Sequence, residues 1–110
     1  MEIFSFSDIK EFQELLDNNG LLLSYYSYEA CSVCKVLKPK VIEVISNEYP
    51  KTNFVYVDVK KHPEISAQNQ VFTVPTILFY VDGKEYFRLG RNFGIDELRY
   101  KIEKIYNLYF

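Results

Sequence analysis

Two cysteines, Cys31 and Cys34, are the residues whose type and spacing most directly suggest chemistry in this chain. Cysteines separated by two residues can hold a metal ion or interconvert between a dithiol and a disulfide. The chain has 110 residues, so it can bury a core without disulfide staples, and a single pair is no scaffold. The pair therefore indicates redox chemistry or metal binding.

The residues around the pair predict a helix from about Ser32 to Glu48. Cys34 falls in the middle of the apolar stripe of this helix, so it is expected to be shielded. Cys31 falls at the edge of the stripe and at the helix start, where it is expected to be more exposed. Unpaired N–H groups and the helix dipole stabilise a thiolate there. Cys31 is thus predicted to attack a disulfide, after which Cys34 attacks Cys31 and releases the reduced partner.

Two other interpretations of the cysteine pair stay open. Both residues could be small apolar core residues, because free cysteine is often buried. A zinc ion is the other possibility, but structural zinc takes four ligands and the chain offers only two thiols and His62. Two chains would have to share such an ion. The position of the pair, after a strand and at a helix start, favours the redox interpretation over both.

The elements that must position the cysteines alternate between strand and helix patterns. A weak alternation over Glu2 to Phe6 predicts a short first strand. Nearly continuous apolar runs predict buried strands at Leu21–Ser27, Asn53–Val59 and Thr76–Val81. Asp82-Gly83 is a tight-turn signal, so the strand that follows is expected to return antiparallel as a hairpin.

Helix signals separate these strands. The first helix is predicted to be capped by Ser7 and to end at Gly20, with that glycine in a left-handed conformation. Pro63 opens a short helix, and the last helix covers about Ile95 to Leu108. The predicted fold is one α/β domain over residues 1–110, of order β-α-β-α-β-α-β-β-α. Its mixed sheet carries helices on both faces.

Composition and charge exclude several classes of protein. A net charge of −2 argues against nucleic-acid binding, and no apolar run approaches the roughly 18 residues of a membrane span. The start of the chain shows no signal-peptide pattern, so the expected location is cytoplasmic. Ten Tyr and nine Phe suit strands and core, while Tyr28 and Tyr100 are candidates for exposure. The chain is expected to be a monomer or a weak homodimer.

Taken together, these motifs resemble the thioredoxin family over nearly the whole chain. The matching residues are Cys31-Ser32-Val33-Cys34 after a buried strand, Lys35, Pro39, Val74-Pro75-Thr76, Asp82-Gly83-Lys84 and Gly90. The resemblance implies a thioredoxin fold and a thiol–disulfide oxidoreductase, with Cys31 as nucleophile and Cys34 as resolving thiol. It implies no metal and no cofactor beyond the redox-active Cys31–Cys34 disulfide. It also implies a cis peptide bond before Pro75, which would face the cysteine pair.

The same resemblance implies a substrate surface and partners. The backbone at Val74 would pair with the substrate chain as an added strand, and Ala30 and Gly90 would line the same surface. The implied substrates are protein disulfides. The implied recycling partner is a flavin-dependent reductase, a glutaredoxin-type protein or a low-molecular-weight thiol.

The chain departs from the family pattern at four places around the cysteines. Ser32-Val33 stands where Gly-Pro is usual, and Ala30 stands where a Trp is usual. Tyr25 takes the position of a buried Asp, and Tyr56 takes the position of the Lys that faces it. A tyrosine with an ordinary pKa near 10 is no base at neutral pH.

These departures leave the proton acceptor for the resolving thiol open between water, Glu29 and Asp58. They also leave two hypotheses for the function. The first is a cytoplasmic thioredoxin-like enzyme that reduces protein disulfides through its dithiol. The alternative is a thioredoxin-fold module that binds a partner with little redox turnover. An oxidant or isomerase fits less well, because such enzymes work in oxidising compartments.

Overall fold

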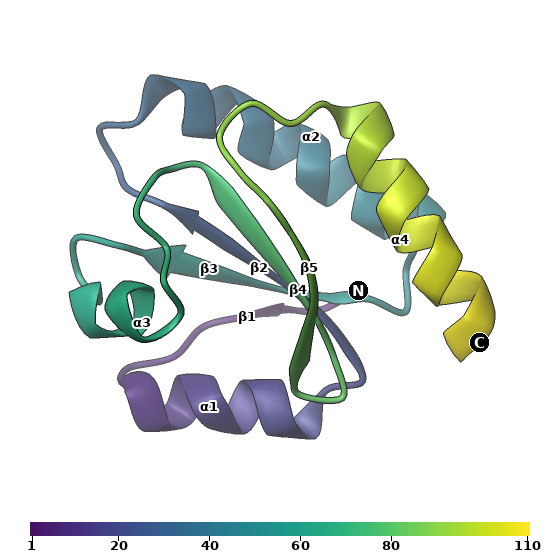
Figure 1. Cartoon of the computed structure of the whole chain (residues 1–110), viewed down its shortest axis with the longest axis horizontal. Coiled ribbons are helices and arrows are strands. Elements are labelled where there is room, and N and C mark those ends of the chain that lie inside the picture. Colours follow the sequence, from purple (N-terminus) through teal and green to yellow (C-terminus); the bar gives the residue numbers. More distant parts are fainter.

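The computed structural model describes all 110 residues, and its nine elements follow the predicted order β-α-β-α-β-α-β-β-α (Figure 1). The strands are β1 (Ile3–Phe4), β2 (Leu21–Ser27), β3 (Asn53–Asp58), β4 (Thr76–Val81) and β5 (Lys84–Leu89). The helices are α1 (Ile9–Asn18), α2 (Ser32–Glu48), α3 (Pro63–Gln68) and α4 (Ile95–Tyr109).

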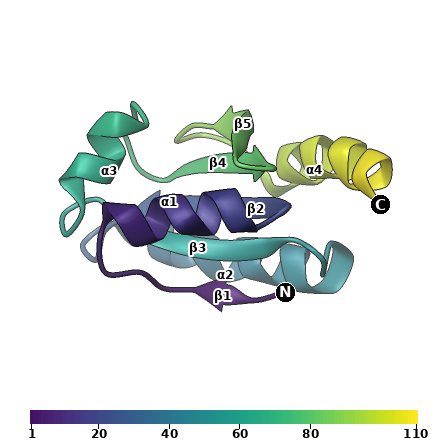
Figure 2. The same cartoon turned by 90° about the horizontal axis from the view of Figure 1, so that it is seen from below.

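The five strands form one mixed sheet in the order β1-β3-β2-β4-β5. Figure 2 shows this order from β5 at one edge to β1 at the other. Strand β3 pairs in parallel with both β1 and β2, whereas β4 is antiparallel to β2 and to β5. All seven residues of the central strand β2 are buried, which explains its nearly continuous apolar sequence. The predicted mixed α/β sheet is thus confirmed.

Two layers of helices cover the sheet and enclose two apolar clusters (Figure 1). Helices α2 and α4 pack on one face, and α1 and α3 pack on the other. Successive residues of β2 alternate between the clusters, so that Leu21, Leu23 and Tyr25 face α2 and α4, while Leu22 and Tyr26 face the other layer. Cys34 belongs to the first cluster, which therefore anchors the cysteine helix on the sheet.

The turn between β4 and β5 forms the predicted hairpin. Asp82 and Gly83 both have positive φ, of 51° and 85°. Two successive left-handed residues match the type I′ turn, whose twist suits an antiparallel pair. The hairpin places the end of β5, at Leu89, beside Ile77 near the start of β4.

Both predicted ends of the first helix are wrong in detail. Asp8, not Ser7, is the N-cap: its carboxylate accepts a 2.9 Å hydrogen bond from the Glu11 N–H. Ser7 lies one residue earlier, and its N–H donates to the Glu11 carboxylate. Gly20 does not have a positive φ, because the helix ends in the extended residue Asn19. A Cβ at Gly20 would instead collide with the side chain of Tyr109 from α4.

None of the four helices is both long enough and apolar enough to cross a membrane.

Candidate active site

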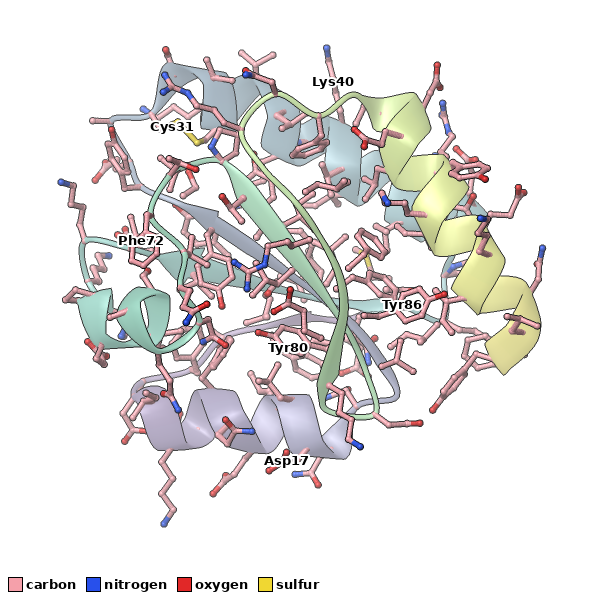
Figure 3. All side chains as sticks on the ribbon, viewed as in Figure 1. Asp17, Cys31, Lys40, Phe72, Tyr80 and Tyr86 are labelled. Carbon is pink, nitrogen blue, oxygen red and sulfur yellow. A yellow bond between two sulfur atoms is a disulfide. The ribbon has the colours of Figure 1, made fainter.

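The cysteine pair lies where β2 passes into α2, and the two sulfurs form a disulfide (Figure 3). The Cα atoms of Cys31 and Cys34 are 5.3 Å apart. Cys31 is half-buried, whereas Cys34 is only 1% exposed and packs in the core beneath α2. This difference agrees with the positions of the two residues on the helical stripe, and it makes Cys31 the sulfur that a partner can reach.

The start of α2 provides a hydrogen-bond donor to the Cys31 sulfur. Cys31 is the N-cap of this 17-residue helix, and its Sγ accepts a hydrogen bond from the Cys34 N–H at 3.2 Å. No acidic residue lies in the first turn of the helix to oppose a negative charge. In the reduced protein the same N–H groups and the helix dipole favour a thiolate at Cys31.

Tyr25 holds the backbone of the buried cysteine rather than acting as a base. Its hydroxyl donates a 3.0 Å hydrogen bond to the carbonyl oxygen of Cys34. Burial, together with the neighbouring Tyr56, raises the pKa of Tyr25 to about 12. Tyr25 and Tyr56 are paired across β2 and β3, and their rings stack with centroids 6.4 Å apart. Two stacked phenols thus lie at the two positions where the resemblance implies an acid and a lysine.

A cavity beside Cys34 is lined by several charged groups. Both expected proton acceptors, Glu29 and Asp58, line this cavity together with Cys34. The Asp58 carboxylate accepts hydrogen bonds from the backbone N–H groups of Lys60 and Lys61. The remaining residues that line this cavity are Ser27, Tyr28, Lys35, Lys38, Tyr56 and Lys61. A proton leaving Cys34 therefore has two carboxylates within the same solvent-filled space.

The loop before β4 lies opposite the start of α2. The Val74–Pro75 peptide bond is cis, and the Thr76 hydroxyl closes the loop with a 2.7 Å hydrogen bond to the Thr73 carbonyl. Ala30, Cys31 and Val74 line one shared pocket. Two of the expected substrate-contacting residues thus meet the exposed cysteine, although they come from segments more than 40 residues apart.

The other two residues expected to contact the substrate, Pro75 and Gly90, do not line the pocket at Cys31. Pro75 is buried and does not line the pocket at Cys31. Gly90 is exposed, and it lines a neighbouring cavity together with Arg91. Arg91 also lines the pocket at Cys31, so it connects the two openings.

Several residues of this site belong to no motif that predicts them. Phe72 is 82% exposed and lines the pocket at Cys31, and Val33 and Val36 are also well exposed. Apolar residues at solvent-facing positions of a helix or loop are the signal that could have identified them. Figure 3 shows Cys31 and Phe72 on the same side of the molecule, at the start of α2 and in the loop before β4.

A guanidinium group from the edge strand holds the segment that leads into this loop. Arg88 of β5 donates hydrogen bonds of 3.0 Å to the carbonyls of Asn69 and Gln70. It also makes two 2.8 Å bonds to the Glu85 carboxylate. Gln70 has a left-handed backbone, with φ of 57°. Arg88 therefore fixes the turn after α3 and, through it, the path toward Phe72.

Groups of three or more His, Cys, Asp or Glu side chains arranged to hold a metal ion are absent from the structure. His62 is the N-cap residue of α3; its ring packs on Phe6 and lies 3.6 Å from the Glu64 carboxylate.

Comparison with known proteins gives a consistent result. The family model described as Thioredoxin matches residues 4–104. Thioredoxin-like protein YdfQ of Bacillus subtilis is 28% identical over 85 residues, which cover 77% of this chain and 75% of that protein. Thioredoxin-1 of Saccharomyces cerevisiae is 29% identical over 83 residues, covering 76% and 80%. The structure of thioredoxin 1 from Thermosipho africanus superposes with a TM-score of 0.74 at 33% identity, covering 80% of this chain and 97% of that one.

Proposed function

This chain belongs to the thioredoxin family of thiol–disulfide oxidoreductases, and we propose that it reduces protein disulfides with Cys31 as nucleophile and Cys34 as resolving thiol. One observation carries the proposal. Cys31 is an accessible sulfur at the N-terminus of a long helix, and it is bonded to a sulfur buried in the core. This arrangement suits one thiol for attack on a partner and the other for release of that partner.

In the first step, the Cys31 thiolate attacks one sulfur of the substrate disulfide. A mixed disulfide forms between Cys31 and the substrate, and the second substrate sulfur leaves as a thiolate that takes a proton from water. The N–H of Cys34, which contacts the Cys31 sulfur, stabilises the attacking thiolate.

In the second step, Cys34 loses its proton and attacks the Cys31 sulfur. The proton passes into the cavity that Glu29 and Asp58 line, because neutral Tyr25 accepts no proton. The Cys31–Cys34 disulfide forms, and the remaining substrate sulfur leaves as a thiolate. Two electrons have passed from the dithiol to the substrate. An external reductant, either a reductase or a low-molecular-weight thiol, then restores the dithiol without any cofactor bound to this chain.

We further propose that Val74 offers its backbone to the substrate as an added strand, that Ala30 and Gly90 flank it, and that cis Pro75 shapes this edge. The working unit is the single domain of residues 1–110. Its place of action is the cytoplasm, because a reductase needs surroundings that keep thiols reduced.

Serine variants of the cysteines test the assignment of roles. Cys31→Ser is expected to abolish reduction of a protein disulfide, because no accessible thiolate remains. Cys34→Ser is expected to accumulate mixed disulfides, because nothing resolves them. Mass spectrometry under non-reducing conditions detects both results. Full turnover by Cys31→Ser would refute the proposed roles.

The reduction potential tests the direction of the reaction. The protein is equilibrated with defined ratios of oxidised and reduced dithiothreitol, and free thiols are counted after alkylation. We expect a two-electron transition near the thioredoxin range of about −270 mV, whereas about −180 to −120 mV would indicate an oxidant or isomerase.

The departures at Tyr25 and Ala30 keep a partner-binding module as the second candidate. Replacing both cysteines by serine separates the candidates. A binding module keeps its partner affinity in the double variant, whereas a reductase loses the covalent capture of its substrates.

A further inference from the structure

We propose that Arg91 gives this reductase a preference for protein disulfides that lie beside an acidic side chain. The inference rests on the proposed function, and it names the class of substrate that the site recognises. The occupant is an extended segment of a folded or unfolded protein, with Asp or Glu close to its disulfide cysteine.

Arg91 is the one arginine of the chain without a carboxylate partner. Arg88 is held by Glu85, and Arg99 is held by Glu48 and Asp96. Arg91 is exposed in the loop between β5 and α4, and it makes no ion pair and no side-chain hydrogen bond. Its guanidinium group is therefore free to bind an anionic group of another molecule.

Arg91 lies on the pocket that contains the reactive sulfur. Arg91 lines the pocket that also contains Cys31 and Val74, where the substrate is expected to cross. It also lines an adjacent groove with Val33 and Val36, both of which are well exposed. One side chain thus borders both the Cys31 pocket and this groove, besides the cavity at Gly90, which Glu97 also lines.

The charges around the Cys31 pocket and the adjacent groove favour an acidic occupant. Neither opening is lined by a carboxylate, and the groove has a second cation in Lys40, further along α2 (Figure 3). The N-terminal end of α2 adds positive partial charge at Cys31. A guanidinium group binds a carboxylate through two parallel hydrogen bonds, and the apolar side chains nearby reduce competition from water.

The groove also predicts which residues accompany the acidic residue in the substrate segment. An extended chain rises by about 3.3 Å per residue, so a side chain within three residues of the substrate cysteine stays within about 10 Å of it. An apolar side chain in the same segment would lie on Val33 and Val36. The preferred substrate segment therefore carries a cysteine, an acidic residue and an apolar residue in close succession.

Two synthetic peptide disulfides test the preference. They are identical except that one carries Glu and the other carries Gln two residues from each cysteine. The measured quantity is the second-order rate constant of a single turnover with the reduced protein, divided by the rate constant of dithiothreitol with the same peptide. Dividing by the dithiothreitol rate constant removes the effect of the carboxylate on the intrinsic reactivity of the peptide disulfide. We expect the ratio to favour the Glu peptide by about 2- to 5-fold, the range of an exposed ion pair.

Substitutions assign this preference to Arg91. Arg91→Gln is expected to remove it, and Arg91→Lys to retain part of it. Lys84→Gln makes the same change in net charge at the exposed β4–β5 turn, and it is expected to leave the preference intact. In about 1 M salt, where charges are screened beyond roughly 3 Å, the wild-type preference is expected to disappear.

Equal ratios for the two peptides, or a preference that survives Arg91→Gln, would overturn the inference while leaving the reductase intact. Failure of the wild-type protein to reduce either peptide or any protein disulfide would overturn the proposed function and this inference with it.

Discussion

The side chain that contacts the backbone of Cys34 is a buried phenol, that of Tyr25. Tyr25 stays neutral far above physiological pH, because burial raises its pKa to about 12. Its hydroxyl is a donor to the Cys34 carbonyl, so its contribution is to hold the first turn of α2 against the sheet. The carboxylates in contact with the cavity at Cys34 belong to Glu29 and Asp58. We therefore expect the proton of Cys34 to leave through this cavity, to water, Glu29 or Asp58, rather than to Tyr25.

Tyr25→Phe tests whether Tyr25 only holds the first turn of α2 or also takes part in proton transfer. We expect the pH profile of disulfide reduction between pH 6 and pH 9 to be unchanged, because Tyr25 does not titrate there. The free energy of unfolding is expected to fall by about 1 kcal/mol, because one buried hydrogen bond is lost. Steady-state kinetics and urea denaturation measure the two quantities. A profile displaced by a full pH unit would show that Tyr25 takes part in proton transfer.

At the scale of elements, the site is assembled from three segments that the sheet brings together. Strand β2 delivers the cysteines at the start of α2, the loop before β4 delivers Val74, and the loop after β5 delivers Arg91. Arg88 of β5 connects β5 to the segment before β4, because its guanidinium group donates hydrogen bonds to the Asn69 and Gln70 carbonyls. The edge strand therefore supports the segment that leads to Val74 as well as completing the sheet.

Arg88→Lys tests this support. A lysine keeps the positive charge but lacks the planar fork that reaches both carbonyls and Glu85. We expect the free energy of unfolding to fall by about 1 kcal/mol, and amide hydrogen exchange to quicken in residues 69–74. Glu85→Gln is the control, since it weakens the exposed ion pair alone and is expected to cost well under 1 kcal/mol. Equal exchange in wild-type protein and Arg88→Lys would contradict the role given to Arg88.

At the scale of the whole molecule, the many aromatic residues mainly build the two cores. The phenol groups buried there resist ionisation. Burial is the largest cause that raises the pKa of Tyr25, Tyr26, Tyr49 and Tyr80. Because a folded-state pKa above the unfolded value means that the folded state holds the proton more tightly, the associated stability is complete below about pH 10. It is lost as the pH rises further.

The oxidised protein is therefore expected to lose stability between pH 10 and pH 12. Urea midpoints at pH 9 and pH 11, with the disulfide intact in both, measure this loss. Tyr25→Phe is expected to reduce the loss, because one raised pKa is removed. Tyr100→Phe is the control and is not expected to reduce the loss, because Tyr100 is exposed and the neighbouring Lys104 lowers its pKa. A midpoint that is the same at both pH values would contradict the prediction.

Local sequence patterns were enough to predict the elements, the fold class and the difference between the two cysteines. Apolar runs and helical stripes are local patterns, and they predicted β2, α2 and β4 with the bounds that the structure has. The place of Cys34 within one such stripe predicted its burial. Asp82-Gly83 predicted the hairpin, because its two positive φ values are a local conformational requirement.

The cap of α1 and the contacts between distant segments could be identified only from the folded structure. Asp8 rather than Ser7 caps α1, because two neighbouring acceptors of similar quality compete and the chain path selects one. Gly20 leaves room for Tyr109, which lies at the other end of the chain. The bond from Tyr25 to Cys34, and the placing of Arg91 beside Cys31 without a carboxylate partner, depend on how β2, α2 and β5 pack. No local pattern encodes the contacts of Gly20, Tyr25 and Arg91, because each depends on how separate strands and helices pack.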